Sequence, residues 1–212
     1  MREAYSFLTV WQNQPIIRVR KGRYLFNFFI NISAGVGGKC SMEGKRLTSY
    51  AMEELECPKC GHKHSLKKYK VINVTEKAKL KEEIMKNRLY QFSCEECEYM
   101  APLTYDSLYV DSRRNIMIYM APVMNAEIKA EIAELEQEKG IDKRLVDNIN
   151  DLKEKIMIAD NHLDDRVIEI IKIMYIDQMK KEMEDDTLLN ILFDYNRDNY
   201  CFLVFFQKKG IG

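Results

Sequence analysis

The sequence predicts an α+β protein in which a zinc-ribbon-like β unit with an inserted helix is followed by an α-helical segment and a terminal β-hairpin. Three observations lead to this prediction. Two Cys-x-x-Cys pairs lie in the first half of the chain, separated by the 33 residues 61–93. Apolar residues at helical spacing dominate much of the stretch after residue 123, and two β-rich runs around a polar turn lie near the end of the chain.

The composition describes a chain that folds by burying a core. Of its 212 residues, 46% are hydrophobic and 31% are charged, which excludes wholesale disorder. No apolar run approaches the roughly 18 to 20 residues needed to span a bilayer, so we expect no membrane segment. Six cysteines are too few for a disulfide scaffold at this length. We therefore expect a cytoplasmic protein with reduced thiols.

The charges balance over the whole chain but not along it. Residues 1–50 hold eight basic and two acidic residues, residues 51–122 hold 12 and 11, and residues 123–212 hold 13 and 20. The net charges of these segments are therefore +6, +1 and −7. Because the residue pattern changes at the same points, we predict a basic N-terminal segment, a cysteine-bearing domain and an acidic helical region that ends in a β-hairpin.

The basic segment, residues 1–50, has the weakest pattern, because its apolar patches are short and interrupted. Disorder is one explanation. Another hypothesis places the biological start later, at Met42 or Met52, so that residues 1–41 would not belong to the native product. A secretory signal peptide that ends before Cys40 is a weaker interpretation, since two asparagines interrupt the apolar stretch.

The expected chemistry lies in the two cysteine pairs. A Cys-x-x-Cys pair folds into a tight knuckle that places two thiolates at two corners of a tetrahedron, and two knuckles together supply the four ligands of Zn²⁺. We therefore predict one structural zinc ion bound by Cys57, Cys60, Cys94 and Cys97. Gly61 supports the first knuckle, because a residue just past such a turn often needs a positive φ.

Other interpretations of the cysteines are weaker. His62 and His64 flank the first pair and offer replacement ligands, but four thiolates already complete a closed site. A redox-active disulfide in the first pair leaves the second pair unexplained. Cys40 and Cys201 lie in no such pair, so we expect ordinary thiols there, with Cys201 inside an apolar strand.

Nothing in the sequence predicts a catalytic site. Catalytic zinc keeps an open coordination position, usually beside three protein ligands, whereas four cysteines close the shell. The chain has three histidines, no nucleophile elbow and no phosphate-binding glycine loop. We assign no catalytic residue and expect the protein not to be an enzyme.

The residues between and after the pairs predict strands around one helix. His64–Val74 is expected as a strand, and Thr75 as the N-cap of a helix over Glu76–Leu89. Two further strands are expected at Leu103–Val110 and Asn115–Met120, with a polar turn between them. This arrangement is a zinc ribbon with a helix inserted between its knuckles.

Several short motifs of this domain match a known family. They are Cys57-Pro58-Lys59-Cys60-Gly61, Ile72-Asn73, Leu80-Lys81-Glu82, the second cysteine pair, Tyr109-Val110-Asp111 and Ile118 to Pro122. With these motifs the chain resembles the CpXC domain family over about residues 54–122, and similar segments follow at 152–156 and 163–169. The resemblance implies a zinc-ribbon-like protein and supplies no catalytic residues. Glu95 and Glu98 depart from the pattern, in which proline and a knuckle glycine are usual.

Helices are predicted in the acidic region after residue 123. A charged helix over Glu127–Glu138 is expected to end at Gly140, and an amphipathic helix is expected over Ile141–Ile156. A third helix, Leu163–Met183, is apolar on more than one side, so it needs burial by its neighbours or by a partner chain. At its start Asp164 and Asp165 are expected to cap the helix rather than bind a cation.

The last predicted element is a β-hairpin formed by Leu188–Tyr195 and Tyr200–Gln207. Its second strand contains the run Phe202 to Phe206, which is too apolar for an exposed edge. We therefore expect another element to cover it.

These features favour a non-catalytic protein-interaction module whose acidic helical region meets a protein partner or a second copy. The main alternative is a nucleic-acid-binding zinc ribbon that uses the basic first knuckle. Glutamates at the second knuckle and a domain charge of only +1 disfavour it. A thiol-redox protein is a more distant third. The basic residues at the first knuckle, which would bind nucleic acid in the main alternative, are Lys59, Lys63, Lys67, Lys68 and Lys70.

Overall fold

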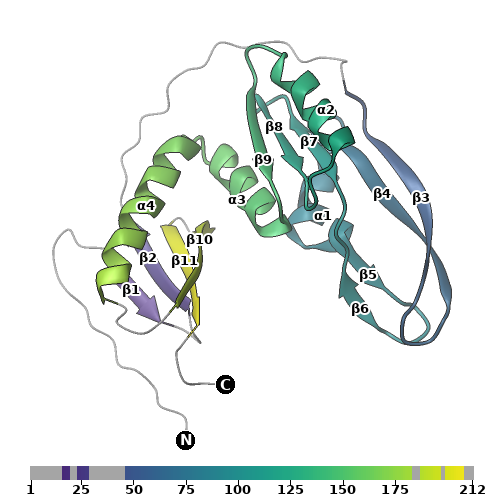
Figure 1. The fold of residues 1–212 in the computed structure, drawn as a ribbon, viewed down its shortest axis with the longest axis horizontal. Helices are drawn as coiled ribbons and strands as arrows, with labels where there is room; N and C mark the ends of the chain where they lie inside the picture. Colours follow the sequence, from purple (N-terminus) through teal and green to yellow (C-terminus); the bar gives the residue numbers. More distant parts are fainter. Residues whose placement is uncertain (1–15, 20–22, 29–45, 183–186, 197–198, 208–212) are drawn as a thin grey trace, which may run out of the picture. The chain divides into compact units, whose positions relative to one another are not determined.

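The computed structural model describes residues 16–19, 23–28, 46–182, 187–196 and 199–207 (Figure 1). The chain forms two compact units. We call residues 36–155 the cysteine unit, and residues 1–35 together with 156–212 the terminal unit. The predicted α+β class is confirmed, with β-sheets, helices and a hairpin near the end of the chain. Cys40 and the alternative start at Met42 lie outside the described residues.

A five-stranded sheet organises the cysteine unit. Its order is β3 (Ser49–Glu56), β4 (Lys63–Asn73), β7 (Ser107–Asp111), β8 (Ile116–Met120) and β9 (Asp142–Val146). The pairs β3–β4 and β7–β8 are antiparallel, whereas β4–β7 and β8–β9 are parallel. Parallel neighbours need a crossover, and a helix lies in each one: α1 (Lys79–Met85) before β7 and α2 (Ala126–Glu136) before β9.

The core of this unit lies where α2 packs on the central strands. Every residue of β7 and β8 is buried, which suits the nearly continuous apolar sequence of β8. Asn125 begins α2, since its Oδ1 accepts the backbone N–H of Ile128 at 2.8 Å. The predicted helix at Glu127–Glu138 is therefore confirmed with slightly different ends. One cluster joins the strands to the helix: Leu108, Val110, Met117, Tyr119, Ala121, Ile128 and Leu135.

Two hairpins carry the cysteine pairs. β4 pairs with β7 only from Val71 to Asn73, so most of the β3–β4 hairpin extends beyond β7 as a two-stranded arm that ends at the first pair (Figure 1). The second pair lies in the connection of a two-stranded sheet formed by β5 (Gln91–Ser93) and β6 (Met100–Pro102). β6 was not predicted, because three residues are too few for a recognisable alternation.

The inserted helix is shorter than the predicted Glu76–Leu89, and Thr75 does not cap it. α1 begins only at Lys79. Asn73 shapes this junction instead, because its Oδ1 accepts the backbone N–H groups of Thr75 and Glu76 at 3.0 and 3.1 Å. The Thr75 hydroxyl accepts the N–H of Ser112 at 2.8 Å. The cap prediction was wrong because an asparagine turn precedes the helix and draws Thr75 toward another loop.

The helix predicted over Ile141–Ile156 is a strand followed by a shorter helix. Its first part is β9, which lies parallel to β8, and its second part opens α3 (Ile149–Asp160). Asn148 separates the two, since its Oδ1 accepts the N–H groups of Asn150 and Asp151. Spacings of four residues suited a helix, but pairing with β8 decides the conformation of β9. Because β9 belongs to the same sheet as β8, the cysteine unit extends to residue 155, and the boundary expected at residue 122 falls inside it.

The terminal unit contains a four-stranded antiparallel sheet and α4 (Asp165–Glu182). Its strand order is β1 (Ile16–Val19), β2 (Arg23–Phe28), β11 (Asn199–Gln207) and β10 (Thr187–Asn196). The predicted hairpin is confirmed as β10–β11, and β2 and α4 supply the cover expected for β11. β1 and β2 belong to the basic N-terminal segment, where no element was predicted.

The start of α4 follows the capping prediction. The carbonyl of Asp164 accepts the N–H groups of Val167 and Ile168, and its carboxylate accepts the N–H of Arg166 at 3.0 Å. Within the described ranges, no acidic cluster near α4 is grouped closely enough to hold a metal. None of the helices in the described part of the chain combines the length and apolar character that a membrane crossing requires.

Candidate metal centre

The first knuckle is the loop that joins β3 to β4. The backbone N–H of Cys57 donates to the carbonyl of His62, and the N–H of Gly61 donates to the carbonyl of Cys57, both at 2.8 Å. Gly61 has a φ of 74°, in the left-handed region. A Cβ at this position would meet Glu56 Oε1 at 3.5 Å, which is ordinary contact. Conformation, rather than crowding, therefore favours glycine there.

The second knuckle repeats this turn between β5 and β6. The N–H of Cys94 donates to the carbonyl of Tyr99 at 2.8 Å, and the N–H of Glu98 donates to the carbonyl of Cys94 at 3.0 Å. Glu98 has a φ of 56°. The glutamate that departs from the family pattern therefore adopts the left-handed conformation that Gly61 adopts in the first knuckle.

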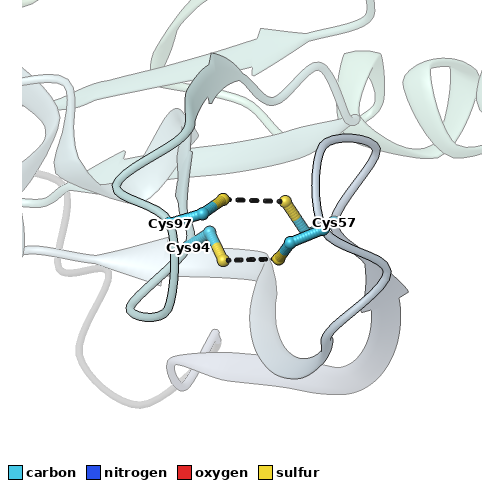
Figure 2. A group of neighbouring side chains, drawn as sticks. Cys57, Cys94 and Cys97 are labelled. Carbon is cyan, nitrogen blue, oxygen red and sulfur yellow. Dashed lines mark hydrogen bonds between the residues drawn. The ribbon is translucent and has the colours of Figure 1, made fainter.

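The two knuckles face each other and bring four sulfur atoms together (Figure 2). The Sγ atoms of Cys57, Cys60, Cys94 and Cys97 all lie within 4.8 Å of one another. Across the knuckles, the Cys57 and Cys97 sulfurs are 3.6 Å apart, and those of Cys60 and Cys94 are 3.5 Å apart. Sulfur atoms about 2.3 Å from a central zinc form a tetrahedron with edges of about 3.8 Å. The spacing therefore fits one tetrahedral metal ion.

Each knuckle buries its first cysteine and leaves the second more accessible. Cys57 and Cys94 are each 1% exposed, whereas Cys60 is exposed and Cys97 is half-buried. Phe92 joins the two buried sulfurs in a small cluster, and a few partly buried side chains pack around it. So small a core gives two hairpins little stability by itself, so a metal cross-link would contribute much of their cohesion.

The sulfurs of this cluster do not ionise equally. Burial raises the pKa of Cys57, but hydrogen bonds from the backbone of Lys59 and Cys60 outweigh it and bring the pKa down to about 7. At Cys60 the backbone of His62 lowers the pKa, but partial loss of hydration and the neighbouring cysteines outweigh this effect and raise the pKa to about 12. Burial is the main cause of the raised pKa of Cys97. The raised pKa values of Cys60 and Cys97 oppose ionisation of these two thiols, and a cation bound among the sulfurs would favour their thiolate forms.

His64 lies beside the sulfur cluster. Its Nε2 is 3.2 Å from Cys94 Sγ, and its ring packs edge-on against Phe92. The group of side chains close enough to share one metal consists of the four cysteines, so neither His62 nor His64 belongs to it. The contact between His64 and a sulfur was not predicted. The alternating pattern of β4 could have indicated this contact, because it places His64 and Leu66 on the same, half-buried face of the strand while their neighbours are exposed.

Three of the lysines near the first knuckle make contacts inside the cysteine unit. Lys68 Nζ lies 2.6 Å from Glu53 of β3, and Lys67 Nζ lies 4.9 Å from the centre of the Tyr50 ring. Lys59 Nζ donates to the carbonyl of Cys97 at 3.4 Å. The β3–β4 hairpin therefore presents mixed charge rather than a uniformly basic surface.

Comparison with known proteins adds a family to this geometry. The family model described as CpXC protein matches residues 55–172, which is more than half of the 212-residue chain. The matched range includes both knuckles, the five-stranded sheet from β4 onward, α3 and the first part of α4. Comparisons with curated proteins and with solved structures found no match.

Proposed function

The chain belongs to the CpXC family, and from this premise we propose that it is a non-catalytic zinc protein whose acidic helical region serves protein interaction. Cys57, Cys60, Cys94 and Cys97 would hold one structural Zn²⁺. The observation that carries this proposal is the closed group of four Sγ atoms from two facing knuckles. When bound, zinc supplies the positive charge that keeps the thiolates ionised.

The donor set supports zinc and a structural role. Four sulfur ligands in a tetrahedron suit zinc or iron, and zinc is the usual ion of structural sites with four cysteines. Four protein ligands leave no coordination position for water or substrate, so the site offers no Lewis-acid catalysis. The proposal places the protein in a reducing compartment such as the cytoplasm, because only reduced thiols bind the metal.

Metal analysis and native mass spectrometry of the full chain test the zinc site. We expect one zinc ion per chain, and its loss when any of the four cysteines is replaced by serine. Cys201→Ser is the matched control for the two buried cysteines, because Cys201, at 2% exposure, is about as buried as Cys57 and Cys94 but lies in β11 of the terminal unit. Zinc retained by Cys94→Ser, or iron in place of zinc, would contradict the proposal.

The same spectra distinguish the thiol-redox alternative. Zinc-free protein lighter by about two or four mass units would contain disulfides. That result, together with activity in an insulin-reduction assay, would replace the structural zinc site by a redox site. We expect neither, since a redox role for one cysteine pair leaves the second pair without a purpose.

Nucleic-acid binding is the alternative that the charge distribution disfavours. Lys59 and Lys68 contact groups of the same unit, and glutamates lie on both hairpins that carry the knuckles. A gel-shift assay at low salt, with Lys63→Glu/Lys70→Glu as the comparison, tests this directly. We expect no shift for either protein. A shift that the double variant and added salt both abolish would instead establish a nucleic-acid interface.

A further inference from the structure

α4 has apolar residues on two opposite faces. Ile168 and Met179 are 0% and 4% exposed and belong to the core that the helix shares with β10 and β11. On the other side, Ile170, Ile173 and Met174 are 58%, 65% and 66% exposed. The sequence predicted that this helix is buried on more than one side. Within the described residues of the terminal unit, only one of its two apolar faces is buried.

The exposed residues form one stripe along the helix. Spacings of three and four residues place Ile170, Ile173 and Met174 on a common face. Arg166 precedes Ile170 by four residues, and Asp177 follows Met174 by three, so these two exposed charges mark the ends of the stripe. Adjacent exposed apolar side chains between charged ends are typical of an interaction surface.

We propose that this stripe, which we call the α4 stripe, binds the same stripe of a second copy of the chain, with the two helices antiparallel about a two-fold axis. The stripe is self-complementary only in this direction. When the axis passes between Ile170 and Ile173, each Ile170 faces the other copy's Ile173, and each Arg166 faces the other copy's Asp177. A parallel pair would instead place like charges opposite each other.

The charges near the stripe are compatible with this arrangement. The Nε and Nη2 groups of Arg166 donate to the carboxylate of Asp164 at 2.9 and 2.6 Å, which holds the guanidinium near the start of α4. A guanidinium has five N–H donors and can serve two carboxylates. Two copies do not repel through net charge, because each chain carries 33 basic and 33 acidic residues.

This inference rests on the proposed interaction role and names its partner, but it does not depend on the metal. Sedimentation equilibrium of the full chain over roughly a hundredfold range of concentration tests it. We expect a reversible monomer–dimer equilibrium. Ile173→Glu should weaken the dimer by about a hundredfold or more, because it places charge at the centre of both halves of the interface. Val123→Glu, an exposed apolar site at 72% outside the stripe, should leave it unchanged.

A charge exchange tests the antiparallel direction. Arg166→Asp and Asp177→Arg should each weaken the dimer by about tenfold, since each creates two like-charged contacts. The double variant Arg166→Asp/Asp177→Arg should recover most of the loss, which a merely structural role of either residue would not produce.

Three results would overturn the proposal: a monomer at every concentration, a dimer indifferent to Ile173→Glu, or no recovery in the double variant. The first would mean that a different partner, or the chain itself, covers the stripe. Zinc content measured on the same samples separates the two proposals. A monomer with one zinc refutes the dimer alone, whereas a dimer without zinc refutes the metal site alone.

Discussion

The two knuckles have different sequences and the same backbone turn. The first contains Pro58 and Lys59 and ends in Gly61, whereas the second contains Glu95 and Glu96 and ends in Glu98. In both, the N–H of the fifth residue donates to the carbonyl of the first cysteine, at 2.8 and 3.0 Å. In both, the fifth residue has a positive φ and the first cysteine is 1% exposed.

This comparison shows which part of the motif the turn requires. Two cysteines three positions apart and a left-handed fifth residue are common to both knuckles, while charge and proline content are not. Glycine adopts the left-handed conformation at little cost, whereas glutamate adopts it at a cost of about 1 to 2 kcal/mol. The second knuckle therefore stores strain that the rest of the site must offset, and variants of the two knuckles should respond unequally.

The largest effect is expected from the buried sulfurs. Cys94→Ser and Cys60→Ser should both lose zinc, but Cys94→Ser should also leave a buried hydroxyl without its metal partner. We expect the Tm of Cys94→Ser to fall by more than about 10 °C and that of Cys60→Ser to fall less, measured by circular dichroism. Equal melting temperatures would show that burial of the first cysteine adds nothing to the metal bond.

A smaller effect is expected at His64, which contacts a sulfur of the opposite knuckle at 3.2 Å. His64→Phe keeps an aromatic ring but removes both ring nitrogens, so zinc affinity should fall by about tenfold in a competition titration with a chelator. His62→Phe is the control. His62 is exposed, and among the described residues it is the His64 side chain, not that of His62, that lies within hydrogen-bonding distance of a sulfur. The same loss in both variants would rule out a specific role for the His64 nitrogen.

Gly61→Ala should cost about 1 kcal/mol of unfolding free energy. The reason is backbone strain at a φ of 74°, because a Cβ there meets only an ordinary contact at 3.5 Å. Urea unfolding of the zinc-loaded protein measures it. A cost several times larger would mean that the added carbon clashes rather than strains the turn.

The smallest effect, with the opposite sign, is expected for Glu98→Gly. Relief of the left-handed strain should exceed the added freedom of the unfolded chain, so the protein should gain up to about 1 kcal/mol. The same urea measurement applies, with Glu95→Gly as the control within that knuckle. Destabilisation by Glu98→Gly would show that the glutamate side chain makes a contribution that outweighs its backbone strain.

Local patterns predicted many elements of the fold. The alternation around Tyr69 and Val71 predicted β4, the apolar run at residues 116–120 predicted β8, and the runs around the turn at 196–199 predicted the terminal hairpin. The predictions failed where a local pattern had two meanings. Leu145 and its neighbours had helical spacing but form a strand, because β8 offers an edge for pairing.

The cysteine spacing by itself determined that the chain has two knuckles, because a Cys-x-x-Cys turn is built from neighbouring residues and carries its own hydrogen bonds. Tertiary structure decided which sulfurs lie opposite each other, that His64 contacts Cys94, that β9 is a strand, and that the outer face of α4 stays exposed in the described residues. These features depend on contacts between residues far apart in sequence. Periodicity records which residues are apolar, but only the packed structure determines what they contact.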